Sequence, residues 1–328
     1  MQPVTTVLVL DPIPELAPYQ LEQETAAAAG ATFVLGDGTL RDAEVILNTG
    51  AMALPAAALR ELRRCRLIIR YGTGYDTVDV AEATRRGIMV ANAPSYGVAE
   101  VADHACALIL ALVRRIPWLD GEVRAGRWSE AHAETPRVRR LSALTLGVVG
   151  LGRIGRAVAR RMAAFELRIL GADPQFSDET IRALGIEPLP LDDLLRAADI
   201  ITLHVPLTPT TQGLIGRREL ALLRPTAMIV NTSRGGVIDE EALTEALAAG
   251  RIFGAALDVL VSEPPDPAHP LLRIDPRRVI LTPHFGSASA DARAALHREV
   301  AAALEMFLSG QAPASLVNPN VVPGIQVR

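Results

Sequence analysis

The sequence predicts an α/β protein with two doubly wound parallel sheets, and three observations support this fold class. Short runs of Val, Ile and Leu alternate with Ala- and Leu-rich stretches of helical length, the pattern of repeated strand–helix–strand units. The runs are nearly continuously apolar, as expected for strands whose sheet is covered by helices on both faces. The chain has 328 residues, which is enough for two domains of ordinary size.

The first sheet is expected in the first hundred residues. Its strands are predicted at residues 6–10, 32–35, 43–48, 66–70 and 88–92. A long helix should follow, from about Val98 to Arg127. Its apolar run at 105–113 is short, so we interpret the helix as packed within the protein and predict no membrane span.

A second, larger sheet is expected in the rest of the chain. Its strands are predicted at residues 145–150, 167–173, 199–204, 227–231, 253–258 and 278–282. The last helix, at about 289–309, has no strand to follow in that sheet, so we expect it to return to the first domain together with the tail.

Composition excludes several classes of protein. The chain is 49% hydrophobic and 21% charged, with a formal net charge of −4, which argues against a protein that coats nucleic acid or an anionic membrane. Two cysteines, Cys65 and Cys106, are too few for a disulfide framework or a zinc cluster, and we expect buried free thiols. The N-terminal residues lack the features of a signal peptide, and a cytoplasmic location is expected.

A glycine-rich turn is the first functional signal. Gly150-Leu151-Gly152-Arg153-Ile154-Gly155 follows a predicted strand and opens a helix, the arrangement that binds a dinucleotide. The first glycine permits the tight turn, the second lets the backbone approach a pyrophosphate, and the third lets the helix pack on the strand. The free N–H groups at the start of the helix suit a diphosphate.

Asp173 indicates which dinucleotide is bound. It lies 23 residues after Gly150, at the end of the next predicted strand. A carboxylate at that place can accept hydrogen bonds from the ribose hydroxyls and would repel a 2′-phosphate, which favours NAD over NADP.

Three further residues follow strands of the same sheet and could carry chemistry. Arg234 comes just after the strand at 227–231, and a guanidinium can bind a carboxylate through two hydrogen bonds. His284 follows the last strand and can exchange a proton. If Glu263, in a proline-rich loop, binds the imidazole, its charge favours the protonated ring, as a general acid requires. No His/Cys/Asp cluster has metal-ligand spacing, so no metal is expected.

A second glycine-rich segment ends the fourth strand of the first domain. The backbone of Arg70-Tyr71-Gly72-Thr73-Gly74 could present N–H groups to a substrate carboxylate. Arg70 has two equally weighted interpretations: it binds a second anionic group of the substrate, such as a phosphate, phosphonate or distal carboxylate, or it pairs with a carboxylate of its own domain.

These segments together resemble the D-isomer-specific 2-hydroxyacid dehydrogenase family over nearly the whole chain. Within it, R-Y-G-T-G is similar to the 3-phosphoglycerate dehydrogenase and C-terminal-binding-protein branches. The matching segments are R-Y-G-T-G-Y-D-T-V-D (70–79), N-A-P-S-Y-G-V-A-E-V-A-D-H (92–104), G-V-V-G-L-G-R-I-G (147–155), V-N-T-S-R-G-G-V-I-D (230–239), G-A-A-L-D-V (254–259), E-P-P (263–265) and T-P-H (282–284).

The resemblance implies a Rossmann NAD domain, residues 104–288, inserted in a flavodoxin-like substrate domain made of residues 1–103 and 289–328, with a cleft that closes on ligand and a homodimer formed through the NAD domain. Arg234 would orient the substrate, Glu263 would be the partner and His284 the acid/base. Arg153 and Ile154 would meet the pyrophosphate and Asp173 the ribose. The further cofactor-binding residues expected are His204, Val205, Pro206, Thr211, Thr232, Ser233, Asp258 and Gly286.

The expected activity is NAD-dependent interconversion of a 2-oxo acid and a D-2-hydroxy acid, on a small-molecule substrate that could carry a second anionic group. The alternative is an NADH-responsive dimeric binding protein of the co-repressor type, without physiological turnover. The intact Arg–Glu–His set favours the enzyme.

Overall fold

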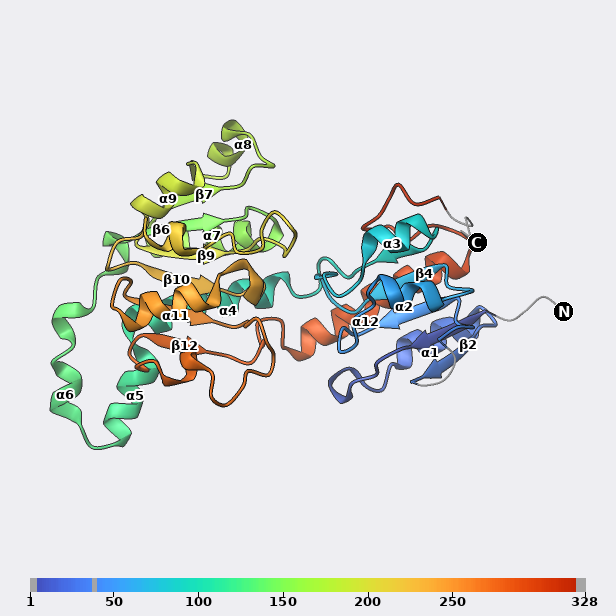
Figure 1. Cartoon of the computed structure of the whole chain (residues 1–328), viewed down its shortest axis with the longest axis horizontal. Coiled ribbons are helices and arrows are strands. Elements are labelled where there is room, and N and C mark those ends of the chain that lie inside the picture. Colours follow the sequence, from blue (N-terminus) through green and yellow to red (C-terminus); the bar gives the residue numbers. More distant parts are fainter. Residues whose placement is uncertain (1–4, 37–39, 323–328) are drawn as a thin grey trace. The chain divides into compact units, whose positions relative to one another are not determined.

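The computed structural model describes residues 5–36 and 40–322, and the chain forms two compact units (Figure 1). Residues 1–97 and 288–328 make one, here called the terminal unit, and residues 98–287 make the other, the central unit. The boundary expected at 103–104 falls inside helix α4 (Val98–Arg114), which belongs wholly to the central unit because it packs on that unit's sheet and on α7. The predicted domain ends at 1–4 and 323–328 lie outside the described residues.

The terminal unit has a five-stranded parallel sheet in the order β2-β1-β3-β4-β5. This is the flavodoxin-like order that the fold class predicted. Each predicted strand is present, some with ends one or two residues shorter. Their bounds are β1 (Thr6–Val9), β2 (Thr32–Leu35), β3 (Val45–Asn48), β4 (Leu67–Arg70) and β5 (Met89–Ala91).

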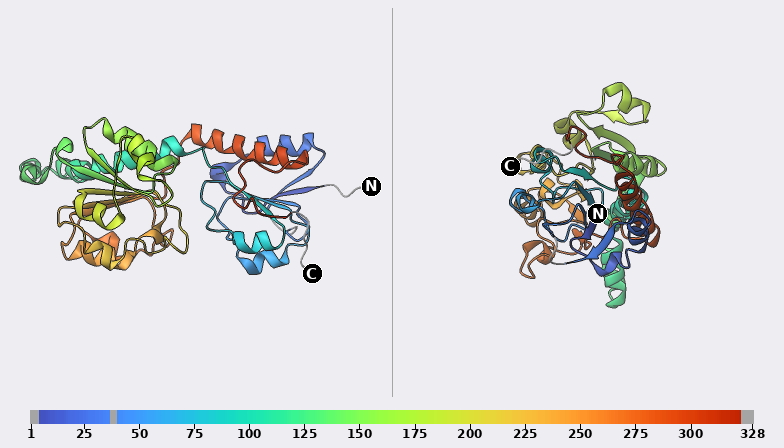
Figure 2. Two further views of the ribbon diagram at one scale, coloured as in Figure 1. Left: turned by 90° about the horizontal axis from the view of Figure 1, so that it is seen from above. Right: turned by 90° about the vertical axis from the view of Figure 1, so that its right-hand side faces the viewer.

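Helices cover both faces of this sheet. In the left view of Figure 2, α1 (Gln20–Ala28) and α12 (Ala290–Leu308) lie side by side along one face, with α2 (Ala56–Glu61) and α3 (Val80–Arg85) on the other. The tail after α12 is tied to β5, because Leu316 forms a bridge with Ala91 and the Asn318 side chain accepts from the amide of Val90 (2.8 Å). Both ends of the chain therefore build this unit.

The central unit has a seven-stranded parallel sheet in the order β12-β11-β10-β9-β6-β7-β8. Six strands match those predicted. The two-residue strand β8 was not predicted, because a run so short carries no periodic signal. The bounds are β6 (Thr145–Val149), β7 (Arg168–Ala172), β8 (Glu187–Pro188), β9 (Ile200–Leu203), β10 (Met228–Asn231), β11 (Gly254–Leu257) and β12 (Val279–Leu281).

The core of the central unit lies on both sides of this sheet. On one side α4 and α7 (Arg153–Ala163) bury their apolar stripes, and on the other α9 (Leu191–Ala197), α10 (Arg217–Leu220) and α11 (Glu240–Ala248) do so. The short helix α8 (Asp178–Ala183) precedes β8. Short 3-10 turns lie at Pro14–Leu16, Thr135–Arg137, Leu141–Ala143, Gly235–Val237 and Pro270–Arg273.

The expectation of a single helix over 98–127 was wrong. That stretch is divided into α4 and α5 (Ile116–Arg124), and α6 (Trp128–His132) follows after a turn. The break is at Arg115, whose φ of 56° is left-handed. Two residues later, Pro117 has no N–H to continue the helical hydrogen bonds. Helices α5 and α6 extend away from the sheet as a helical arm, residues 116–132 (Figure 1).

Two expectations about side chains and membranes can be compared directly with the structure. Cys65 and Cys106 are both free, and burial raises the pKa of Cys65 to about 12 and that of Cys106 to about 11. Across residues 5–36 and 40–322, no helix has the length and apolar character needed to cross a membrane.

Candidate active site

The residues singled out in the second half of the sequence follow the carboxyl ends of the central strands, on one edge of the sheet. The strand order reverses between β6 and β9, and open α/β sheets bind ligands in the crevice at such a point. From one side of the edge to the other, the residues that follow successive strands are His284 (β12), Asp258 (β11), Arg234 (β10), His204 (β9), Gly150 (β6) and Asp173 (β7).

The glycine turn has the geometry that a pyrophosphate requires. Gly150 has φ of 90°, and a Cβ there would lie 2.7 Å from the His204 carbonyl oxygen. A Cβ at Gly155 would lie 2.0 Å from the Gly150 carbonyl oxygen, so only glycine lets α7 start here. A Cβ at Gly152, the N-cap of α7, would meet nothing within 4 Å. The N–H groups of Arg153 and Ile154, in the first turn of the helix, have no intrahelical acceptor.

Asp173 stands beside this turn. Its Oδ2 accepts from the amide of Leu151 at 2.7 Å and its Oδ1 from the amide of Gln175 at 2.9 Å. The carboxylate therefore fixes the glycine turn from the neighbouring strand. Each carboxylate oxygen has a second lone pair, which leaves acceptor capacity for ribose hydroxyls.

The next strands supply further groups that fit a dinucleotide. Thr232, 9% exposed, has a buried Oγ1 without a hydrogen-bond partner, as expected of an atom that a bound cofactor would satisfy. His204 has its pKa lowered by burial to about 3, so its ring is neutral. It bonds Thr202 through Nε2 (2.9 Å), and Thr211 bonds the Pro206 carbonyl (2.5 Å). These residues fit a dinucleotide.

His284 is held in a strained turn. Its φ is 52°, a conformation that a residue with a side chain adopts only when its surroundings impose it. Its amide donates to the Asp258 carbonyl (2.7 Å), and the Asp258 carboxylate accepts from the amides of Phe285 and Gly286 (both 2.8 Å). Asp258 is only 2% exposed, so it lies beneath the turn and orders it.

Glu263 and His284 form a hydrogen-bonded pair. The Nδ1 atom of His284 lies 2.7 Å from Oε2 of Glu263, and the amide of Leu260 donates to Oε1 (2.9 Å). Burial by itself would raise the pKa of Glu263, but the hydrogen bonds from His284 and Leu260 and the positive charges of His284 and Arg234 bring it below its usual value. The carboxylate is ionised near neutral pH, and it leaves the imidazole's other nitrogen, Nε2, as the atom that can exchange a proton.

The loop that carries Glu263 has anchors that the sequence did not reveal. Glu240, at the start of α11, accepts from the amide of Val261 (3.1 Å) and bonds His269 (2.8 Å). Gly235 lies against the loop so closely that a Cβ there would be 2.0 Å from the Leu260 carbonyl carbon. Neither anchor has a motif, because each contact joins residues 20 or more positions apart in the sequence.

Arg234 extends from β10 toward this pair. Its Nη1 donates to the Ser233 carbonyl (2.8 Å), and its own carbonyl accepts from the Asn231 side chain (2.9 Å). The Ser233 amide and hydroxyl also bond Asn231, which fixes the turn. Because the charge of Arg234 helps to lower the pKa of Glu263, the cation lies within electrostatic range of the acid/base pair.

His104 is a residue that sequence reasoning passed over as structural. It lies on α4, and its Nε2 is 3.1 Å from the Thr282 hydroxyl and 3.3 Å from Oδ1 of Asp258. Through these contacts, His104 supports the turn that carries His284. In the sequence, the signal that could have identified His104 is its position at the end of the segment 92–104.

In the terminal unit, the segment 71–74 turns its carbonyls inward. The carbonyl of Gly72 accepts from the amide of Ala93 (3.1 Å) and that of Thr73 from the Asn92 side chain (2.8 Å). Among the described residues, the amides of Thr73, Gly74 and Tyr75 have no acceptor, whereas the amide of Gly72 donates to Arg70. This arrangement leaves consecutive N–H groups for an anion.

The side chains of Tyr71, which begins this segment, and of Arg70, which precedes it, are buried. Tyr71 packs edge-on against Tyr19 and His297 in the core of the unit. The guanidinium of Arg70 also lies inside, 7% exposed, where it donates to backbone carbonyls.

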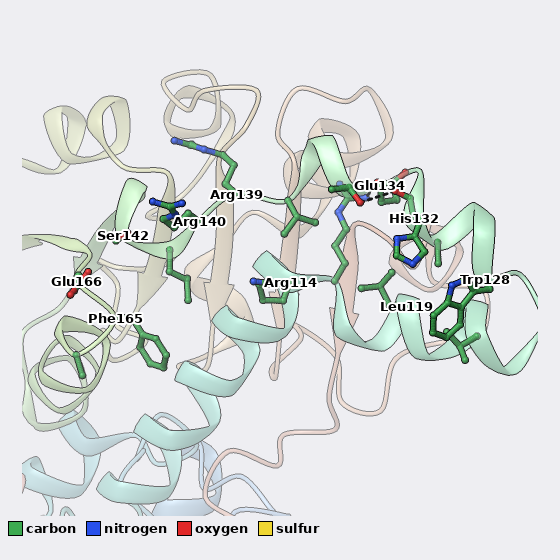
Figure 3. Close-up of a pocket in the computed structure, with 17 residues that line it drawn as sticks. Arg114, Leu119, Trp128, His132, Glu134, Arg139, Arg140, Ser142, Phe165 and Glu166 are labelled. Atoms are coloured by element: carbon green, nitrogen blue, oxygen red, sulfur yellow. Dashed lines mark hydrogen bonds and ion pairs between the residues drawn. The ribbon is translucent and has the colours of Figure 1, made fainter.

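A hollow of about 910 Å³ lies elsewhere in the central unit, around the helical arm (Figure 3). Leu119, Trp128 and His132 line one side, and Phe165 and Glu166 line the other. None of the residues predicted to bind cofactor or substrate lines it, so it is separate from the candidate active site.

Comparison with known proteins gives the family. The profile of the "D-isomer specific 2-hydroxyacid dehydrogenase, NAD binding domain" matches residues 106–286. A glyoxylate reductase of Korarchaeum cryptofilum is 41% identical over 292 residues, 88% of this chain and 87% of that protein. A D-3-phosphoglycerate dehydrogenase of Methanocaldococcus jannaschii is 39% identical over 96% of this chain, which spans 60% of that relative's length.

Solved structures agree with the sequence comparisons. A D-lactate dehydrogenase of Aquifex aeolicus, crystallised with NAD and lactic acid, superposes with a TM-score of 0.85 at 28% identity, covering 98% of this chain and all of that one. The chain therefore belongs to the D-isomer specific 2-hydroxyacid dehydrogenase family and is an NAD(P)-dependent oxidoreductase that acts on CH–OH donors.

Proposed function

We propose that the protein reduces a 2-oxo acid to the D-2-hydroxy acid, and catalyses the reverse reaction, with His284 as acid/base and Arg234 as the anchor of the substrate. The observation that carries the proposal is the Glu263–His284 pair, whose 2.7 Å hydrogen bond occupies Nδ1 and leaves Nε2 for the substrate. Arg234 follows β10, which one strand separates from β12, the strand that precedes His284.

The chain's own residues account for the polar steps. Arg234 binds the substrate carboxylate and draws electron density toward the carbonyl oxygen. Protonated His284 donates the Nε2 proton to that oxygen as it becomes a hydroxyl, and in the reverse direction the neutral ring accepts it. Glu263 stabilises the charged ring and holds its orientation. A bound nicotinamide cofactor supplies or accepts the hydride.

We propose NAD as the preferred cofactor. Solved relatives have been crystallised with NAD and with NADP, so the family alone does not decide. Asp173 favours NAD, because its carboxylate would repel a 2′-phosphate at the ribose. Arg153, Ile154, Val205, Thr232, Ser233 and Gly286 are the other groups expected along the cofactor.

The amides of Thr73 and Gly74 are proposed to bind the substrate carboxylate. Their orientation supports this role, since the carbonyls of the same segment are bonded inside the terminal unit. Two amides that point the same way give a fixed partial positive charge without a side chain.

A homodimer through the central unit is also proposed. The helical arm exposes apolar side chains, among them Trp128 at 64% and Ile116 at 55%, and it borders the hollow of Figure 3. A second copy of the arm would bury this surface. Analytical ultracentrifugation should give a dimer, and Trp128→Glu should convert it to a monomer. A wild-type monomer at micromolar concentration would contradict the proposal.

The function itself is tested by following NADH and NADPH oxidation at 340 nm with a panel of 2-oxo acids. Turnover of at least one acid, faster with NADH, is expected. NADH-dependent capture of a protein partner, together with no turnover on any acid, would favour a co-repressor type of binding protein instead.

A further inference from the structure

Arg70 does not extend toward solvent from the end of β4. Its Nε donates to the Gly74 carbonyl (3.1 Å), and its Nη1 donates to the carbonyls of Asn48 (3.0 Å) and Tyr71 (3.3 Å). A guanidinium has five N–H groups, so three of them are already directed at the backbone of the unit. The cation therefore joins the end of β3 to both ends of the segment 71–74.

Burial fixes this arrangement. Arg70 is 7% exposed, and Gly50 covers its guanidinium so closely that a Cβ there would lie 2.7 Å from both Nη atoms. Turning the side chain outward toward a ligand would break three hydrogen bonds and take the guanidinium donor away from the carbonyls of Tyr71 and Gly74, whereas the Asn48 carbonyl would keep its bond from the Tyr71 amide.

These contacts have a direct consequence for the anion-binding amides. Arg70 holds the carbonyls of Tyr71 and Gly74, while Asn92 and the amide of Ala93 hold those of Thr73 and Gly72. All four carbonyls of the segment are directed inward, so the amides of Thr73 and Gly74 face the other way. Arg70 acts on the substrate through this backbone, as a positioning residue.

The stretches that follow four of the five strands at this edge contain acids and no basic residue. The stretches that follow β1, β3, β4 and β5 (residues 10–19, 49–55, 71–79 and 92–97) contain four acids and no Lys, Arg or His. One of the acids, Asp11, is bonded by the amides of Thr49, Gly50 and Met52 (2.7, 3.0 and 2.8 Å). These four stretches therefore supply no cation of their own to pair with a second anionic group on a substrate; Arg293 of α12 is a cation close to them, because it donates to the Glu15 carbonyl (3.4 Å).

We infer that the preferred substrates are 2-oxo acids with a single anionic group, and that Arg70 shapes the carboxylate cradle without binding a phosphate or a second carboxylate. The inference rests on the proposed function and narrows its substrate class. Of the two interpretations of Arg70 that the sequence left open, it rejects the binding of a second anionic group; the contacts within the unit that support this are with backbone carbonyls, where the second interpretation expected a carboxylate.

The test compares hydroxypyruvate with 3-phosphohydroxypyruvate, which differ only in the phosphate, and glyoxylate with oxaloacetate. Wild-type kcat/KM should be at least tenfold higher for the acid with one anionic group in each pair. A preference for the dianionic acids would overturn the inference and leave the proposed function intact. No turnover with any of the four would overturn both.

Variants separate positioning from direct binding. Arg70→Lys replaces the fork of Nε and Nη1 by a single nitrogen, which cannot occupy both positions from which Arg70 reaches the carbonyls. KM should therefore rise by roughly tenfold for every acid that the wild type reduces, with the ratio within each pair and the Kd for NADH unchanged. Arg66→Lys, at the other end of β4, is the matched control and should be unaffected. A loss confined to the dianionic acids would show that Arg70 binds the second anion.

A second variant removes a different hydrogen bond to the carbonyls of the segment 71–74. Asn92→Ala removes the donor to the Thr73 carbonyl and should also raise KM for every acid in the same proportion. Melting temperatures identify any variant that fails to fold. If Asn92→Ala folds with unchanged KM, the carbonyl contacts do not control substrate binding and the positioning role is refuted.

Discussion

Replacing Glu263 with Gln tests how the acid/base pair works. Glu263 accepts two hydrogen bonds, from His284 at 2.7 Å and from the amide of Leu260 at 2.9 Å, with one oxygen each. Gln has a single acceptor oxygen. If that oxygen stays with Leu260, the NH₂ group faces Nδ1 of His284 and favours the wrong tautomer of the ring.

The magnitude follows from the geometry. A charge 2.7 Å from the ring contributes about 1.5 kcal/mol at the dielectric constant of water, which corresponds to about a tenfold factor in rate. The water value is appropriate because both side chains are more than one third exposed, 45% for His284 and 37% for Glu263. Loss of general acid catalysis should add a fall in kcat of about 10²–10⁴-fold.

The pH dependence has a definite sign. The pKa of Glu263 is below the ordinary value of 4.5, so its carboxylate keeps its charge, and its effect on the imidazole, until the pH falls through that lowered pKa. Because Glu263 is therefore ionised from pH 5 to 9, the kcat of Glu263→Gln should lie below the wild-type value across that whole range.

The assay is NADH oxidation at 340 nm from pH 5 to 9, with Glu187→Gln as the control. Glu187 is exposed on β8 and pairs with Arg168 through hydrogen bonds remote from the catalytic pair in the sheet order. A Glu263→Gln enzyme with wild-type kcat across this pH range would refute the reasoning.

Three further predictions follow from the central unit. Gly152→Ala should weaken NADH binding, measured by calorimetry, about tenfold with little change in melting temperature, because a Cβ there meets no protein atom within 4 Å. Gly155→Ala should instead cost about 3 kcal/mol of folding free energy. If the two variants changed NADH affinity and melting temperature equally, this distinction would be contradicted. Asp173→Asn should raise the NADPH-to-NADH ratio of kcat/KM about tenfold, and an unchanged ratio would remove the repulsion argument. Gly235→Ala should displace the Leu260 carbonyl, 2.0 Å from the new Cβ, and lower kcat with NADH affinity retained; a wild-type kcat would show that the loop tolerates the shift.

Local sequence signals predicted the sheets well. The strands are nearly continuous apolar runs, and their alternation with helical stretches predicted the fold class and eleven of the twelve strands found in residues 5–36 and 40–322. The glycine turn was also readable, since its three glycines have distinct steric reasons that appear in order along the chain.

What the sequence could not predict depends on contacts between distant residues. The helix break at Arg115 sits next to Pro117 but needs a left-handed residue that no pattern marks. Glu240 and His104 support the catalytic loops from other helices. The segment R-Y-G-T-G does not indicate that Arg70 binds backbone carbonyls, because the same residues are equally compatible with a cation that binds a ligand.

The measurement that tests the central claim most directly is turnover by His284→Ala with its best 2-oxo acid, together with the Kd for NADH. The account predicts that kcat falls by about 10²–10⁴-fold while NADH binds as in the wild type, because Nε2 of His284 delivers the proton and the glycine turn binds the cofactor. A variant that retains wild-type kcat would contradict the role of His284 and, with it, the proposed mechanism.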